Sequence, residues 1–252
     1  MQFILKIYRG VPGHQYWEEF AFDLAAGDNV ISCLMAIQKN PVNKQGKKVA
    51  PVVWEQGCLE EVCGSCSMLI NGKPKQACSA IIEPLLQQTA SRTITLAPFT
   101  KYPLIRDLVV DRTALFDSLK KISGWIETDG SFVQGFGPKV TQEEQEEIYP
   151  LSTCMSCACC LEACPQINKN SSFIGAAPIS QVRLFNTHPT GKADAQARLR
   201  ILMEEGGISE CGNAQNCVQV CPKKIPLTES IAAMGRDVSL QALKDFFGSP
   251  ER

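Results

Sequence analysis

The arrangement of cysteines constrains this chain more than any other feature of its sequence. Its 252 residues include thirteen cysteines, and an odd number cannot all pair as disulfides within one chain. The first ten residues carry charges and partly alternate, which suits a strand rather than a signal peptide. We therefore expect a reducing compartment, where clustered cysteines usually bind metal or act in catalysis. Apart from Cys33, the cysteines form three batches: Cys58, Cys63, Cys66 and Cys78; Cys154, Cys157, Cys159, Cys160 and Cys164; Cys211, Cys217 and Cys221.

The composition is that of a folded protein without a nucleic-acid-binding charge excess. Hydrophobic residues make up 44% and charged residues 20% of the chain, which argues against disorder. The formal net charge is -1, so no overall basic excess attracts nucleic acid or an acidic membrane surface. We find no run of about 18 apolar residues, the length that a membrane-spanning helix needs.

The first batch has the spacing of a plant-type [2Fe–2S] site. Four intervening residues separate its first two cysteines and two separate the next pair, which matches the C-x4-C-x2-C…C pattern. Gly57 and Gly64 let the loop fold tightly, since neither carries a Cβ. A structural zinc site is the alternative, but zinc ligands usually come as two close pairs. The predicted ligands are Cys58, Cys63, Cys66 and Cys78.

The second and third batches form two interlocked runs of the bacterial ferredoxin type. Such runs place their fourth cysteine on the other cluster. Assigning the last cysteine of each run to the cluster of the other run predicts one [4Fe–4S] site. Its ligands are Cys154, Cys157, Cys160 and Cys221. The other site has three ligands: Cys164, Cys211 and Cys217. Ala214 stands where a further cysteine would complete this set, and three ligands point to [3Fe–4S], with Ala214 as the determinant of cluster type.

The remaining candidate ligands favour structural roles. Cys159 lies inside the second batch but out of phase with it, so we expect a buried neighbour of a cluster rather than a ligand. Cys33 falls within a predicted amphipathic helix and is expected in the core. His14 and His188 are isolated in the sequence, and the glutamates at 143–147 fit a solvated helix start.

Apolar patterning predicts a strand-rich first hundred residues. Phe3, Leu5 and Ile7 alternate on one face of an opening strand. The other elements expected are strands at Tyr16–Leu24 and Thr93–Ala97, a helix at Val30–Gln38 capped by Asp28 or Asn29, and a hairpin of Ser67–Ile70 and Lys75–Ser79 around Asn71-Gly72. A small mixed sheet with a helix across it is the expected result.

The second half reads as helical and follows a connector. The connector contains a short helical stretch near Leu115–Ile122 and the Gly-rich segment Gly130–Gly137. Helices are expected at Thr141–Ile148, Gln196–Glu205 and Leu227–Asp237. We predict a [2Fe–2S] domain over 1–103, a connector over 104–140 and a helical two-cluster domain over 141–252.

The sequence lacks motifs for two-electron or hydrolytic chemistry. No Gly-x-Gly-x-x-Gly follows a strand, so nothing indicates a flavin or nicotinamide fold. No Ser/His/Asp set or pair of catalytic carboxylates is apparent. Three clusters in one chain therefore indicate one-electron relay to a partner that performs the two-electron step.

The whole chain resembles the iron–sulfur subunit of succinate dehydrogenase and fumarate reductase, the respiratory complex II family. The cysteine spacings match batch by batch, and four further segments carry the likeness: Ile37–Val42, Arg106–Asp111, Phe173–Ala177 and Pro222-Lys223. The resemblance implies an α+β chain: a plant-ferredoxin-like β-grasp domain, then an all-helical bacterial-ferredoxin-like domain.

The resemblance also implies partners and an order of cofactors. An FAD-containing flavoprotein subunit exchanges a hydride with succinate or fumarate, and a haem-containing membrane anchor completes the complex. The [2Fe–2S] cluster lies nearest the flavin, [4Fe–4S] is central, and [3Fe–4S] faces the quinone. The chain itself is then a non-flavin subunit without a dicarboxylate site, held on the cytoplasmic face of a bacterial membrane. Succinate oxidation and fumarate reduction use the same series of clusters, so the cysteine spacing favours neither reaction.

Two other interpretations stay open at the sequence level. A free ferredoxin-type carrier would be shorter and strongly acidic. A cluster subunit of another membrane oxidoreductase commonly keeps two full four-cysteine runs, which Ala214 breaks here.

The resemblance finally suggests which quinone is used. Ubiquinone-using relatives typically carry a Trp shortly after the proline that corresponds to Pro165, and a His where Gly212 stands. Here Ile167, Asn168 and Lys169 occupy the first place. We therefore expect menaquinone, bound mainly by the anchor, with Pro165, Gln166 and Gly212 as quinone-side candidates.

Overall fold

The computed structural model describes residues 2–127 and 139–248. It divides into two compact units. The N-terminal unit comprises Met1–Arg112 and Met155–Ala163, and the C-terminal unit comprises Thr113–Cys154 and Cys164–Arg252. The predicted boundaries at 103 and 140 stay a prediction, and the Gly-rich segment Gly130–Gly137 lies outside the described residues.

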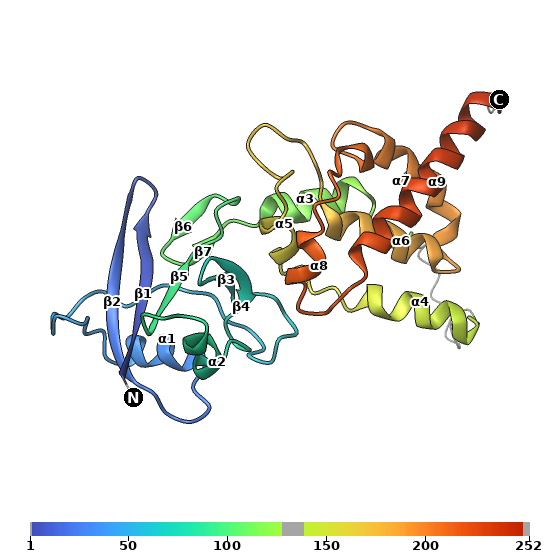
Figure 1. The fold of residues 1–252 in the computed structure, drawn as a ribbon. Helices are drawn as coiled ribbons and strands as arrows, with labels where there is room; N and C mark the ends of the chain where they lie inside the picture. The colour runs from blue at the N-terminus through green and yellow to red at the C-terminus, as the bar shows by residue number, and fades with distance from the viewer. Residues whose placement is uncertain (1, 128–138, 249–252) are drawn as a thin grey trace. The chain divides into compact units, whose positions relative to one another are not determined.

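The N-terminal unit is built on a mixed five-stranded sheet of order β2-β1-β5-β3-β4 (Figure 1). β1 (Gln2–Val11) pairs antiparallel with β2 (His14–Asp23) and parallel with β5 (Thr93–Ala97). β3 (Ser67–Ile70) pairs antiparallel with both β5 and β4 (Lys73–Gln76). A short second sheet joins β6 (Leu104–Arg106) and β7 (Val109–Val110).

The core of this unit follows the predicted alternation. Phe3, Leu5 and Ile7 are all buried on one face of β1. They share a core cluster with the apolar side of α1 (Val30–Lys39). Asn29 caps α1, since its side chain accepts a hydrogen bond from the Ser32 N–H. The predicted sheet with a helix across it is therefore confirmed.

The hairpin between Cys66 and Cys78 differs in one detail from the prediction. Asn71-Gly72 forms the turn with both residues at positive φ, 50° and 74°. The return strand is β4 (Lys73–Gln76), so it starts and ends earlier than the predicted Lys75–Ser79. Cys78 therefore lies in the turn after β4 and not on the strand itself. The short helix α2 (Ile82–Gln87) follows it.

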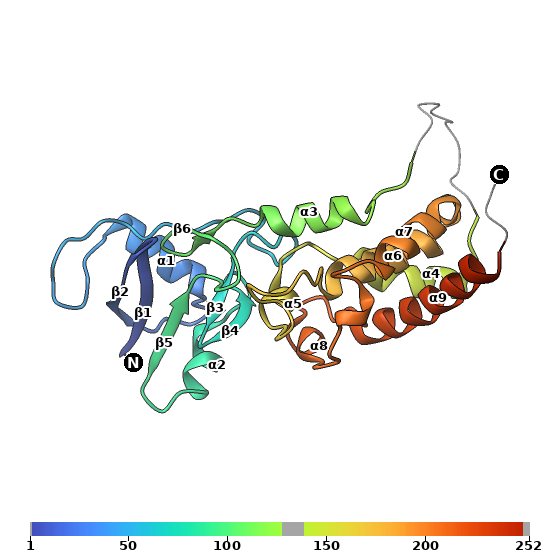
Figure 2. The same cartoon turned by 90° about the horizontal axis from the view of Figure 1, so that it is seen from above.

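The C-terminal unit is helical, and α6 and α7 pack on the long helix α9 (Figure 2). Its core includes Ile179, Val182, Leu202 and Met234. Its longer helices are α3 (Thr113–Lys121), α4 (Gln142–Ser152), α6 (Ala176–Thr187), α7 (Ala195–Met203) and α9 (Leu227–Phe247). The shorter ones are η1 (Gly191–Asp194), η2 (Ile208–Glu210) and α8 (Asn216–Val220), while α5 (Cys159–Glu162) belongs to the N-terminal unit.

Helix starts were predicted better than helix ends. Thr141 caps α4 in a capping box with Glu144, as the acidic start indicated. α9 begins at the predicted Leu227 but continues to Phe247, well past Asp237.

Within residues 2–127 and 139–248, no helix is both long enough and apolar enough to cross a bilayer. The architecture is α+β, a sheet unit and a helical unit, as expected.

Candidate iron–sulfur sites

The loop that carries Cys58 and Cys63 surrounds their sulfurs with backbone donors. The Cys58 Sγ accepts hydrogen bonds from the N–H groups of Glu60, Val62 and Cys63 at 3.2–3.4 Å. The Cys63 Sγ accepts from the N–H groups of Cys58 and Ser65, at 3.3 and 3.5 Å. A ring of N–H donors is what an anionic thiolate, or a cluster sulfur, requires.

Left-handed backbone turns this loop inward. Leu59, Glu61 and Gly64 have φ of 61°, 59° and 75°. A Cβ at Gly57 would lie 2.8 Å from the Cys63 Sγ, and one at Gly64 would lie 2.9 Å from the Cβ of Cys157. A side chain at either position would collide with a cysteine, so the loop can fold this tightly only because both residues lack a Cβ, as the sequence predicted.

The other two cysteines of the batch lie deeper. Cys66 immediately precedes β3, Cys78 follows β4, and both are buried, whereas Cys63 is exposed. Burial raises the pKa of Cys66 to about 11, and the neighbouring Cys78 contributes. Hydrogen bonds with the Ser65 hydroxyl and with backbone N–H groups lower the pKa of Cys63 to about 6. The donor set and its cradle fit a [2Fe–2S] cluster held by these four cysteines.

Arg112 binds the backbone of this loop, a contact that the sequence did not predict. Its Nη1 donates to the Gly64 carbonyl at 2.9 Å, and its Nη2 donates to the Ser65 carbonyl at 2.7 Å. Nη2 also pairs with the Glu55 carboxylate at 3.1 Å. The only sequence signal was its place directly after the Arg106–Asp111 segment.

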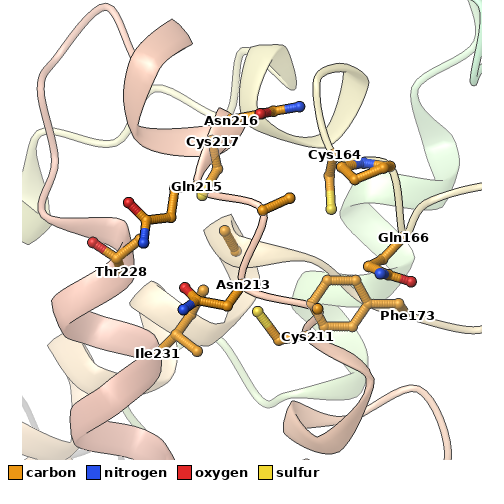
Figure 3. Close-up of a pocket in the computed structure, with 14 residues that line it drawn as sticks. Cys164, Gln166, Phe173, Cys211, Asn213, Gln215, Asn216, Cys217, Thr228 and Ile231 are labelled. Carbon is orange, nitrogen blue, oxygen red and sulfur yellow. The ribbon is translucent and has the colours of Figure 1, made fainter.

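Three cysteines of the C-terminal unit line one pocket (Figure 3). The sulfurs of Cys164, Cys211 and Cys217 face its interior. Cys217 is buried, and this burial raises the pKa of its thiol. The predicted three-ligand set is thus brought together in one unit.

Ala214 lines the same pocket, as expected for the position that lacks a fourth thiol. Its neighbours Asn213 and Gln215 have φ of 50° and 61°. These left-handed residues bend the backbone around Ala214 between Cys211 and the start of α8. Three thiols, with the Ala214 methyl group where a fourth thiol would stand, make a donor set that fits [3Fe–4S], and Cys164, Cys211 and Cys217 would hold it.

The quinone-side candidates Pro165, Gln166 and Gly212 also line this pocket. A Cβ at Gly212 would lie 2.2 Å from the Gln166 Nε2, so the Gln166 side chain occupies the space beside Gly212. Asn168 instead bonds locally, with its Nδ2 donating to the carbonyls of Pro165 and Gln166.

The four cysteines predicted for [4Fe–4S] lie in different parts of the chain's structure. Cys157 and Cys160 lie in the N-terminal unit, while Cys154 and Cys221 lie in the C-terminal unit. A hydrogen bond with Cys159 lowers the pKa of Cys157 to about 7. The joint ligation by these four cysteines stays a prediction from their spacing.

Four residues were expected to have structural roles and not to bind metal: Cys33, Cys159, His14 and His188. Cys33 is buried in the core, and burial raises its pKa to about 12. Cys159 is fully buried. The His188 Nδ1 accepts a hydrogen bond from the Thr190 N–H, and His14 starts β2. Among the described residues, no three His, Cys, Asp or Glu side chains are arranged to hold a single metal ion. A cluster of several irons spreads its ligands more widely than one ion does.

Comparison with known proteins agrees with the two cysteine-rich regions. The model of a 2Fe-2S iron-sulfur cluster binding domain matches residues 4–117, and that of a 4Fe-4S dicluster domain matches residues 150–225. The succinate dehydrogenase iron-sulfur subunit of Bacillus subtilis is 52% identical over 249 residues, covering 99% of this chain and 96% of the relative. The chain belongs to the iron–sulfur subunit family of succinate dehydrogenase and fumarate reductase.

More distant members and a solved structure extend this result. The fumarate reductase iron-sulfur subunit of Wolinella succinogenes is 30% identical, with 71% of this chain and 74% of the relative covered. A chain of the Mycobacterium smegmatis Sdh1 complex in the apo form shares the fold, with a TM-score of 0.76 at 21% identity, covering 100% of this chain and 99% of that one.

Proposed function

We propose that this chain is the electron-transfer subunit of a succinate:quinone oxidoreductase or quinol:fumarate reductase. It relays electrons one at a time between a flavoprotein subunit and membrane quinone. The observation that carries the proposal is the pair of thiol sites in the two units. One is the loop whose backbone N–H groups donate to the sulfurs of Cys58 and Cys63. The other is the pocket lined by three thiols and Ala214. Membership of the family supports the same function.

The chain's own residues hold and tune the redox groups. Bound [2Fe–2S], [4Fe–4S] and [3Fe–4S] clusters supply one-electron carriers whose potentials depend on cluster type, hydrogen bonding and burial. The N–H groups around Cys58 and Cys63 stabilise negative charge on these thiolates. Arg112 fixes the carbonyls of Gly64 and Ser65, so the loop keeps its shape.

The two-electron chemistry belongs to the partners under this proposal. A flavoprotein carrying FAD exchanges the hydride, and a haem-containing anchor binds the complex to the cytoplasmic face of the membrane. The chain is then a peripheral subunit, and its sequence carries no flavin-binding Gly-x-Gly-x-x-Gly after a strand.

Menaquinone is the proposed quinone. Gly212 offers no side chain toward a headgroup, and the Gln166 amide fills the adjoining space in the pocket. The aromatic and imidazole donors of ubiquinone-using relatives have no counterpart at these positions. The anchor should therefore supply most polar contacts to the quinone.

Purification of the native complex tests the function directly. The chain should co-purify with a flavoprotein and a membrane protein, and the membranes should show signals of three clusters by low-temperature EPR. A chain that elutes alone and exchanges electrons only with small soluble carriers would contradict the proposal. Turnover of the complex with menaquinol and ubiquinol analogues, measured side by side, tests the quinone, and a strong preference for ubiquinone would refute that part.

A further inference from the structure

Gln76 is a buried polar residue beside a predicted ligand of the [2Fe–2S] cluster. It ends β4, lies opposite Ser67 in the β3–β4 ladder, and is 2% exposed. The Cys66 thiol donates to its Oε1, with 3.6 Å between the atoms. On the other side its Nε2 donates to the Ser67 Oγ at 2.7 Å and to the Cys159 Sγ at 3.5 Å.

The surroundings fix which end of the amide faces Cys66. The Ser67 hydroxyl gives its only proton to the Gly64 carbonyl, at 2.6 Å. Its oxygen is therefore left as an acceptor, which requires the Nε2 of Gln76 and not the Oε1. Rotating the amide would bring two oxygens together at Ser67 and lose a buried hydrogen bond.

Cys159 holds the amide in the same orientation. The Cys159 sulfur accepts a hydrogen bond from the Gln76 Nε2 at 3.5 Å, so the nitrogen of the amide and not its oxygen faces this sulfur. This gives the out-of-phase cysteine of the second batch a definite contact within the N-terminal unit.

We propose that Gln76 is a positioning residue that lowers the reduction potential of the [2Fe–2S] site, by keeping its carbonyl oxygen against Cys66. The inference rests on the proposed function, because it concerns a cluster bound by Cys66. A ligating Cys66 has lost its proton, so the negative end of the amide then faces a sulfur that shares the cluster's charge. Reduction adds a further negative charge, which this dipole opposes.

The test uses the intact complex and a redox titration followed by EPR of the [2Fe–2S] signal. In Gln76→Leu the opposing dipole is gone. Ser67→Ala removes the shorter of the two contacts that orient the amide, at 2.7 Å, and leaves only the 3.5 Å contact with the Cys159 sulfur, so the amide can rotate and donate its Nε2 to Cys66. Both variants should raise the midpoint potential. At a fixed poise the ratio of reduced to oxidised cluster should rise about tenfold, as expected for one hydrogen-bond-sized interaction with a charged group.

Gln87→Leu is the matched control, since Gln87 is an exposed glutamine at the end of α2 in the same unit. Its potential should equal that of the wild type. A side chain that only fills space would leave the potential unchanged in Ser67→Ala, so an unchanged potential there overturns the inference. A lower potential in Gln76→Leu would show a donating amide and would also overturn it.

Failure of the proposed function gives a different result. A wild-type complex without a [2Fe–2S] signal contradicts the function, whereas a normal wild-type titration with unshifted variants contradicts only the role of Gln76. Because Ser67→Ala removes a single hydroxyl, it keeps the inference testable should Gln76→Leu fail to fold.

Discussion

Arg9 and Asp107 form a buried ion pair between residues 98 positions apart in the sequence. The Arg9 Nη2 lies 3.3 Å from the Asp107 Oδ2, and both side chains are 3% exposed or less. The carboxylate also accepts hydrogen bonds from the N–H groups of Gly10 and Val53, at 2.7 and 2.8 Å. Asp107 thus fastens the segment after β6 to β1 and to the chain that leads into the cysteine loop.

Replacing Asp107 should destabilise the N-terminal unit. Asp107→Ala leaves the Arg9 charge short of one partner and removes the acceptor of two N–H groups. We expect a loss of about 3–5 kcal/mol, typical of a broken buried pair. The denaturant concentration at which the [2Fe–2S] absorbance disappears measures this loss.

Asp23→Ala is the matched control, because Asp23 is an exposed residue at the end of β2. Its denaturation midpoint should stay near that of the wild type, within about 0.5 kcal/mol. Equal midpoints for the two variants would contradict the role given to Asp107.

Local patterns predicted those elements whose signals do not depend on tertiary contacts. β1 followed from the alternation of Phe3, Leu5 and Ile7, and α1 from its cap at Asn29. The capping box at Thr141 likewise predicted the start of α4.

Several strands and helices that the sequence pattern did not predict correctly contain a proline. Pro74 lies within β4, but β4 is an edge strand, where a missing N–H can face away from the ladder. Pro84 and Pro178 fall in the first turns of α2 and α6, whose N–H groups lack helical partners in any case. A proline that looks like a breaker in the sequence is therefore compatible with each element.

The cysteine batches were visible in the sequence because ligand spacing is local. The contacts of Gln76, Arg112 and Gln166 were not, since each depends on residues that only the fold brings near. Gln76, for example, reaches Cys159 across 83 positions of sequence.

Cys63→Ser should damage one cluster and spare the others. A neutral hydroxyl is a poor replacement for a thiolate ligand, and Cys63 is a predicted ligand of the [2Fe–2S] cluster only. The other predicted ligands all lie within residues 154–221. Iron content and EPR should show loss of the [2Fe–2S] signal with the other two retained.

Cys33→Ala provides the control for this experiment, because Cys33 is buried in the core of the same unit and is not a predicted ligand. It should retain all three signals. If Cys63→Ser lost every cluster while the chain stayed folded, the prediction that the first batch of cysteines binds its cluster independently of the other two batches would be wrong.

Gly212→Ala should move the Gln166 side chain without unfolding the protein. The added Cβ would lie 2.2 Å from the Nε2, which is the far end of a flexible side chain. We expect unchanged iron content and a several-fold higher KM for a menaquinol analogue. Gln166→Ala should give the same increase, and the double variant should be no worse than either single one. Additive effects would indicate that the two positions act separately.

Ala214→Cys should change the type of cluster in the C-terminal pocket. Ala214 lines this pocket together with Cys164, Cys211 and Cys217, and a thiol there completes the ferredoxin spacing. A fourth thiolate allows a fourth iron, so we expect conversion of [3Fe–4S] toward [4Fe–4S] and a lower potential at the quinone end. Low-temperature EPR of the oxidised protein should then lose the [3Fe–4S] signal. Ala214→Ser, which adds a group of similar size but a poor ligand, should keep it. An unchanged [3Fe–4S] signal in fully loaded Ala214→Cys protein would show that residue 214 does not determine the cluster type.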